Sequence, residues 1–153
     1  MNNQNPLTAG REALLARLST ISVADGYLTN VGANVHSGWL NEVIKAQTVA
    51  YPLLVVQPGR GQPPAAGPGA IKLQPGFRIV GAVEAGTSYE SALEDLQLDV
   101  MRCLLPGHKN FLKWLPLGVT GIQFGTPDAF PPGDGLSCAT FLLPVYLTTL
   151  IQQ

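Results

Sequence analysis

The side chains best suited to nucleophilic or metal chemistry are two histidines and two cysteines, and they are scattered along the chain. His36 and His108 each lack a neighbouring serine or cysteine in a recognisable motif, so neither has a nucleophile to activate. Cys103 and Cys138 form neither a disulfide framework nor one of the paired spacings that hold a metal. We interpret both cysteines as buried thiols and both histidines as ordinary polar residues.

Two further patterns resemble known sites without completing them. The run Gly59-Arg60-Gly61 is not followed by the lysine and hydroxyl residue of a phosphate-binding loop. Asp128 and Asp134 lie in a stretch rich in proline and glycine, where aspartate is a common turn residue. The sequence therefore predicts a protein that is not an enzyme and that binds no metal and no cofactor. The alternative, a small enzyme or ligand-binding protein, would have to use His36, Asp128 and Asp134.

The chain is unusually poor in charge. Charged residues make up 12% of its 153 residues, about half the share of a typical soluble domain. The formal net charge of −1 provides no basic field to attract nucleic acid or an anionic membrane. Residues 1–6 lack a signal-peptide pattern, and the longest apolar run, 139–147, is too short to span a membrane. We expect one domain, made in the cytosol, whose weakly solvated surface is partly covered by protein partners.

Two main helices are predicted. Residues 8–19 have leucines at helical spacing, and residues 87–105 begin with the capping box formed by Thr87 and Glu90. A shorter helix or turn is expected over 39–46.

Four stretches have the alternating or β-branched pattern of strands, and a weaker hairpin pattern covers 27–35. The four are 49–56, 77–85, 117–124 and 138–151. Pro52 and Pro144 argue for a bulge or an edge position in their strands. This order lacks regular βαβ alternation, so we predict an α/β fold of the α+β type. Its mostly antiparallel sheet of about four to six strands would carry the two main helices.

Two long loops are also expected. Between residues 58 and 76, ten of 19 residues are proline or glycine, and between 125 and 135, six of 11 are. Proline makes the first of these semi-stiff and extended. It is predicted either to reach a neighbouring subunit or to be an unstructured surface loop.

The second main helix carries two apolar stripes. The first, which contains Leu93, Leu96 and Val100, is the expected core face. A second group lies on nearly the opposite side and consists of Leu98, Met101 and Leu105. It is buried either under the chain's own loops or against another subunit, and the low charge of the chain favours the subunit.

Several of these segments together resemble the tail-terminator, or tail-completion, proteins of tailed bacteriophages. The resemblance covers about residues 9–105 and the closing strand. It rests on a pattern of helix, Gly-Tyr turn, proline-led strand and acidic helix, in the segments 12–18, 24–32, 51–56, 77–83 and 89–96.

The resemblance implies an α/β subunit of a hexameric ring in the virion. Such a ring caps the tail tube, stops its polymerisation and joins it to the head-side connector. Its partners would be further copies of the chain, the tube protein, the connector or neck protein and, in a contractile tail, the sheath. DNA would only pass through the lumen. We predict subunit packing by Leu98, Met101 and Leu105 and polar interface contacts by Arg60 and Arg78. Another neck component, a head-closure or adaptor protein, is the alternative.

Overall fold

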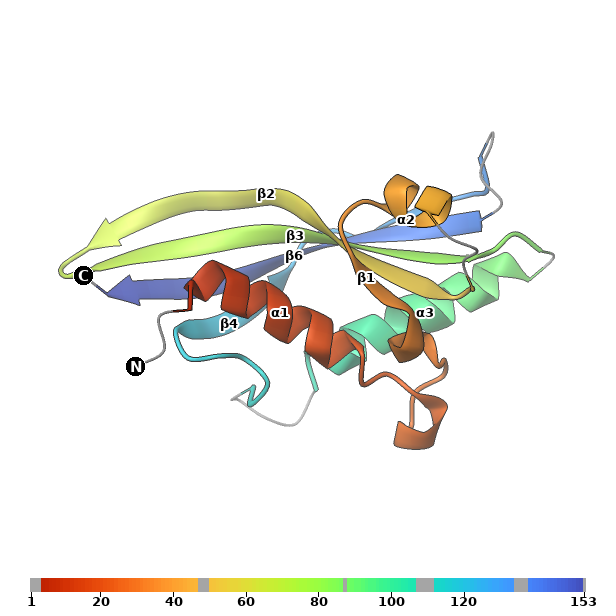
Figure 1. The fold of residues 1–153 in the computed structure, drawn as a ribbon, viewed down its shortest axis with the longest axis horizontal. Coiled ribbons are helices and arrows are strands. Elements are labelled where there is room, and N and C mark those ends of the chain that lie inside the picture. Colours follow the sequence, from red (N-terminus) through yellow and green to blue (C-terminus); the bar gives the residue numbers. More distant parts are fainter. Residues whose placement is uncertain (1–3, 47–49, 87, 107–111, 134–137, 153) are drawn as a thin grey trace.

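The protein is built on one long, twisted sheet with helices on both faces (Figure 1). The computed structural model describes residues 4–46, 50–86, 88–106, 112–133 and 138–152. Six strands are found in these ranges, in the order β1-β2-β3-β6-β4, with β5 also paired to β6. They are β1 (Val35–Ser37), β2 (Leu53–Gly67), β3 (Ala70–Glu84), β4 (Val119–Phe124), β5 (Asp128–Phe130) and β6 (Cys138–Gln152). Only the β1–β2 pair is parallel. The fold is α+β with a mostly antiparallel sheet, as the sequence predicted.

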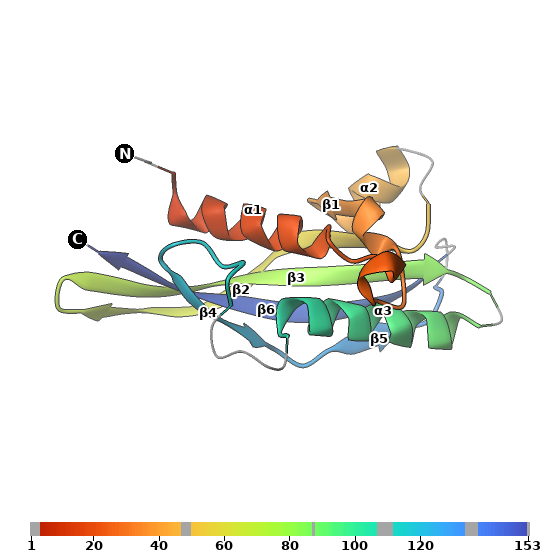
Figure 2. The same ribbon diagram turned by 90° about the horizontal axis from the view of Figure 1, so that it is seen from below.

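The predicted main helices are α1 (Pro6–Leu18) and α3 (Tyr89–Leu104), and both pack on one face of the sheet (Figure 2). The Asn5 side chain begins α1 by accepting a hydrogen bond from the backbone N–H of Leu7 at 2.9 Å. Thr87, half of the capping box predicted for α3, lies outside the described residues. The main core lies between these helices and the alternate residues of β6, namely Ala139, Phe141, Leu143, Val145 and Leu147.

A smaller apolar cluster lies on the opposite face, under α2 (Leu40–Ala46). There Val43 and Ile44 pack against Leu53, Val55 and other buried residues of the sheet. Because α2 covers only one end of this face, the remaining part is free of any described helix (Figure 1). The short helix predicted over 39–46 is confirmed.

The predicted loop over 58–76 is wrong, since this segment forms a β-hairpin made by the long ends of β2 and β3. Its prolines fit because β1 pairs only with Leu54–Val56, so that the outer edge of β2 beyond them needs no backbone donors. Pro75 lies where the pairing of β3 with β6 skips from Leu73 to Gly76. The prolines therefore occupy edge and irregular positions of a real hairpin.

Pro144 also differs from expectation, because β6 lies inside the sheet between β3 and the pair β4 and β5. The Pro144 carbonyl accepts a hydrogen bond from the N–H of Gly125 at 2.8 Å. A strand residue directs its nitrogen and its carbonyl to the same side of the strand. The Pro144 nitrogen, which carries no hydrogen, therefore faces the gap between the end of β4 and the start of β5, where no strand residue needs a donor. The segment predicted as a loop over 125–135 contains β5, while Asp134 and Gly135 lie outside the described residues.

The hairpin predicted over 27–35 is wrong as well. The segment follows the 3-10 turn Val23–Asp25 and itself contains the 3-10 turn Val31–Asn34, after which β1 begins at Val35. The backbone N–H groups of Leu28 and Thr29 donate to the carboxylate of Asp99 on α3. They are therefore not available to a strand partner, and the helix determines the path of this segment.

Candidate subunit interface

The outward face of α3 carries the apolar residues predicted to pack against another subunit. Leu98, on α3, is 45% exposed, and Leu105, the residue directly after the last turn of the helix, is 40% exposed. Met101 lies between them but is half-buried and packs against the main core. Exposed leucines at helical spacing form an apolar strip that the described part of the chain does not cover.

Arg60 and Arg78 lie together on the other layer of the molecule, on the sheet face that α2 leaves open. Both line a shallow hollow of about 300 Å³ that also contains Asp128 and Tyr146. Arg78 belongs to β3 and Arg60 to β2, and the hairpin pairing brings them together. The predicted residues thus form two separate surfaces, one on α3 and one on the open sheet face. Two different surfaces are what a head-to-tail contact between copies requires.

Asp99 is the important residue that the sequence analysis did not identify. Its carboxylate is fully buried on the inner side of α3. It accepts hydrogen bonds from the backbone N–H groups of Leu28 at 3.0 Å and Thr29 at 2.8 Å, and from the Thr29 hydroxyl at 2.8 Å. The signal was present, because Asp99 lies among the apolar residues of the core stripe, where a carboxylate must have partners. Its role is to fix residues 28 and 29 against α3.

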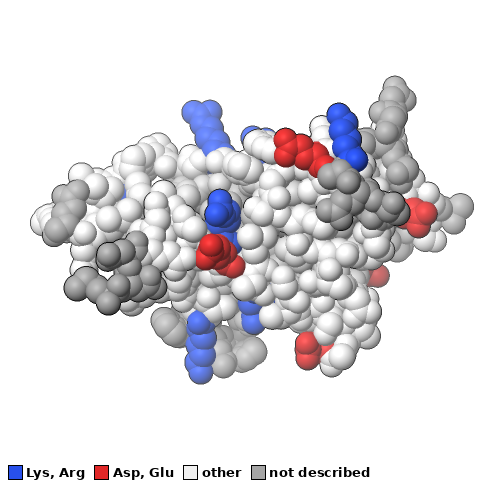
Figure 3. Space-filling model, in the orientation of Figure 1, with Lys and Arg blue, Asp and Glu red and all other residues white. Residues whose placement is uncertain are grey.

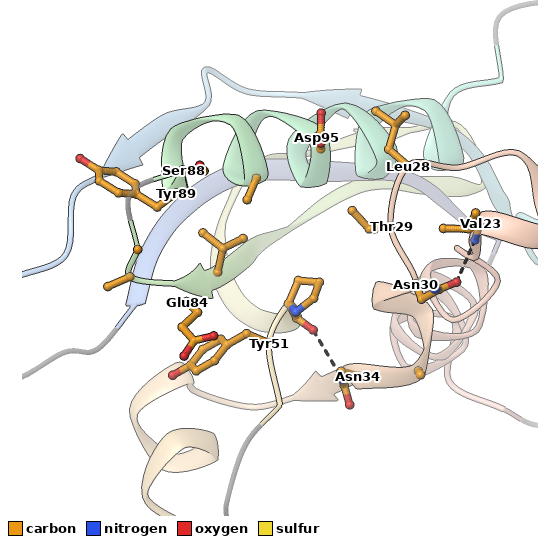
Figure 4. A pocket seen from close by; sticks show the side chains of 16 residues that line it. Val23, Leu28, Thr29, Asn30, Asn34, Tyr51, Glu84, Ser88, Tyr89 and Asp95 are labelled. Carbon is orange, nitrogen blue, oxygen red and sulfur yellow. Dashed lines mark hydrogen bonds between the residues drawn. The ribbon is translucent and has the colours of Figure 1, made fainter.

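That contact forms one end of a groove with a volume of about 1000 Å³. Figure 4 shows Tyr89 and Asp95 of α3 along one wall, and Tyr51 and Glu84 along the other. The segment that Asp99 holds closes the groove with Leu28 and its neighbours Thr29 and Asn30. The Asn30 side chain accepts a hydrogen bond from the N–H of Val23 at 2.9 Å, which ties this end together.

The side chains of the alternative, enzymatic interpretation do not come together. His36 of β1 and Asp128 of β5 lie in one row across the sheet, joined through the pairs with Val55, Val80 and Leu142. Four strand spacings of about 4.8 Å separate them by about 19 Å. His108 and Asp134 are outside the described residues. Within the described ranges, no group of three or more His, Cys, Asp or Glu residues is placed to hold a metal ion.

Both cysteines are free and buried, as the sequence predicted. The Cys103 thiol donates to the carbonyl of Arg17 at 3.2 Å, and the Arg17 Nε donates back to the carbonyl of Cys103 at 2.9 Å. Burial raises the pKa of the Tyr27 hydroxyl, and its hydrogen bond with Cys103 raises it further. Burial also raises the pKa of the Cys138 thiol. The pair of hydrogen bonds between Arg17 and Cys103 joins α1 to α3, whereas Cys138 begins β6 and packs in the smaller apolar cluster.

Charged side chains are sparse on the surface. On the face seen in Figure 3 they are few, some of them as neighbouring blue and red groups, with wide uncharged areas between them and no basic patch. Over the described residues, no helix is both long enough and apolar enough to cross a membrane. No protein-family model and no curated protein matches the chain.

Proposed function

We propose that this protein is a structural virion subunit that assembles into a closed ring on the end of a phage tail tube. The ring is a hexamer that stops tube polymerisation and joins the tube to the head-side connector. The observation that carries the proposal is the apolar strip formed by Leu98 on α3 and Leu105 directly after the helix, both of which are exposed. The low charge of the chain and its resemblance to tail-terminator proteins support the same assignment.

The mechanism is steric and energetic. Copies pack head to tail through two different surfaces, and the rotation between them closes the ring. One ring face matches the last ring of the tube, and the other lacks the groups for further stacking and meets the connector. The apolar strip supplies the association energy, since burying apolar surface is worth about 25 cal/mol per Å².

The double variant Leu98→Glu/Leu105→Glu is expected to remain folded but to lose ring assembly. Both side chains are already exposed, so the charges cost little in the monomer, whereas a carboxylate buried in a subunit contact is strongly unfavourable. We expect assembly to weaken at least about 30-fold. Native mass spectrometry measures the stoichiometry, and negative-stain microscopy with tail tubes locates the ring.

Leu117→Glu is the matched control, because Leu117 is fully exposed and lies outside α3. This variant should form rings of the same stoichiometry as the unmodified protein. A chain that stays monomeric at all concentrations, alone and on tail tubes, would rule the proposal out. Binding to portal-side complexes in place of tail tubes would identify a different neck component.

A further inference from the structure

The tip of the β2–β3 hairpin has a composition that its own chain does not explain. Residues 61–69, here called the hairpin tip, are exposed along their whole length and contain no charge. Apart from Gln62 they are all proline, alanine or glycine. The hairpin tip projects past the helices in both ribbon views (Figures 1 and 2). Its base carries Arg60 and Lys72, the only charged residues between 58 and 76.

The hairpin tip is poorly suited to pair with an added strand. Pro63 and Pro64 lack the backbone N–H groups with which an added strand would pair. With no side chain larger than glutamine, the hairpin tip is narrow as well as semi-stiff. A narrow, stiff and uncharged element is suited to insertion between side chains.

The groove between α3 and the end of β3 has matching properties. Its lining includes Tyr89 on the α3 wall, Tyr51 on the other wall and Leu28 at one end (Figure 4). Both tyrosines are partly buried, Tyr89 against the main core and Tyr51 against the smaller apolar cluster. Aromatic-lined grooves are common binding sites for proline-rich segments. Among the described residues, the charged side chains that line it are Glu84 and Asp95, both exposed. An apolar centre bordered by two acids is thus complementary to an apolar tip bordered by two cations.

The hairpin tip and the groove of one chain are too far apart to meet. Strand β3 begins at Ala70 beside the tip and ends at Glu84 on the groove wall. Its 15 residues span about 50 Å at about 3.3 Å per residue. The two elements therefore lie at opposite ends of the sheet, and only a second copy can bring them into contact.

We infer that the hairpin tip of one copy docks in the groove of the next copy. Arg60 and Lys72 then face Glu84 and Asp95 across the contact, and the prolines pack against the tyrosine rings. This inference rests on the ring assembly proposed above and names the contact that closes it. Because the tip and the groove are different surfaces, the contact is head to tail and repeats around the ring.

Charge reversal on either side tests the contact. Arg60→Glu/Lys72→Glu makes the tip acidic, and Glu84→Lys/Asp95→Lys makes the groove basic. All four side chains are exposed, so both variants should fold, with unchanged circular dichroism and thermal unfolding. Each variant alone places like charges together and should assemble on the order of 100-fold more weakly than the unmodified protein.

Mixing the two variants in equal amounts should restore rings, since every tip then meets a groove of opposite charge when the copies alternate. Analytical ultracentrifugation and native mass spectrometry measure this recovery. Arg11→Glu/Glu12→Lys, an exposed pair on α1, is the matched control and should assemble normally. Recovery on mixing excludes misfolding as the cause of the loss.

Normal assembly of either variant alone overturns the inference, and so does a mixture that stays unassembled. If both variants still form rings but fail to bind tail tubes, the occupant of the groove is a tube subunit and the inference is wrong. In each of these cases the unmodified protein still forms rings, so the proposed function stands. If the unmodified protein forms no rings, the proposed function itself fails.

Discussion

Replacing Asp99 with alanine is expected to lower the free energy of unfolding by about 4 kcal/mol. The carboxylate is fully buried and accepts the backbone N–H groups of Leu28 and Thr29 together with the Thr29 hydroxyl. Alanine would leave two backbone donors without partners in a buried site, each at a cost of about 1–3 kcal/mol, and would add a cavity. Urea denaturation followed by circular dichroism measures the loss.

Replacing Asp99 with asparagine should lower the free energy of unfolding by about half as much as replacing it with alanine. The asparagine carbonyl oxygen, in the place of Oδ2, can keep the two hydrogen bonds from Thr29 and the one from the Leu28 N–H at 3.1 Å. Its NH₂ group, in the place of Oδ1, cannot accept the second bond from the Leu28 N–H, now 3.0 Å long, and opposes that N–H with a donor. Asp95→Asn on the same helix is the control, because Asp95 is exposed and its replacement should change stability by less than about 0.5 kcal/mol. Equal unfolding midpoints for the Asp99→Ala and Asp95→Asn variants would contradict the role assigned to Asp99.

The sequence was sufficient to predict the fold class, because most of its elements carry regular periodicity. The alternating apolar residues of β6 and the leucines of α1 each define a face that must be buried, and such patterns are local. Four patterned strands and two helices, in an order without regular βαβ alternation, favour an α+β fold with the helices packed on one sheet. Local patterns therefore placed the core correctly.

The hairpin between 58 and 76 could not be predicted in the same way. Proline is unfavourable in a strand whose two edges are paired but is tolerated where one edge is free. Neighbouring strand residues direct their N–H groups to opposite sides, so only one of Pro63 and Pro64 can face the free edge; both lie where the pairing of β2 with β3 shifts register between Gln62 and Ala65. The free edge depends on how short β1 is, and both the edge and the shift are properties of the assembled sheet. Composition alone therefore indicated a loop.

The candidate surfaces were only partly predictable for a related reason. The spacing of Leu98 and Leu105 indicates their shared helix face, which the structure leaves exposed. Arg60 and Arg78 share a hollow only because β2 and β3 pair in one register, with Gln57 opposite Arg78. The groove requires the contact between Asp99 and residues 28 and 29, which lie about 70 positions away in the chain. Pairings at this distance leave no periodic signal in the sequence.

Gly81→Ala is the second substitution for which a large loss of stability is expected, about 3 kcal/mol. Gly81 of β3 lies directly opposite Phe141 of β6. A Cβ atom on Gly81 would overlap the Phe141 ring and would lie 2.7 Å from its Cζ atom. The ring is fully buried in the main core, to which Leu93 and Leu96 of α3 also belong, and close packing there opposes its movement. Thermal and urea unfolding measure the effect.

Gly121→Ala in β4 is the matched control, because a Cβ atom there meets nothing within 4 Å. It should leave stability unchanged or raise it by about 0.5 kcal/mol, since alanine has less conformational freedom to lose. The double variant Gly81→Ala/Phe141→Leu tests the mechanism directly. If the clash causes the loss, the smaller leucine makes room for the methyl group, and the double variant is at least about 1 kcal/mol more stable than the sum of the single effects. If the losses of the two single variants simply add, the clash with Phe141 is not the cause, and Gly81→Ala lowers stability through the backbone instead.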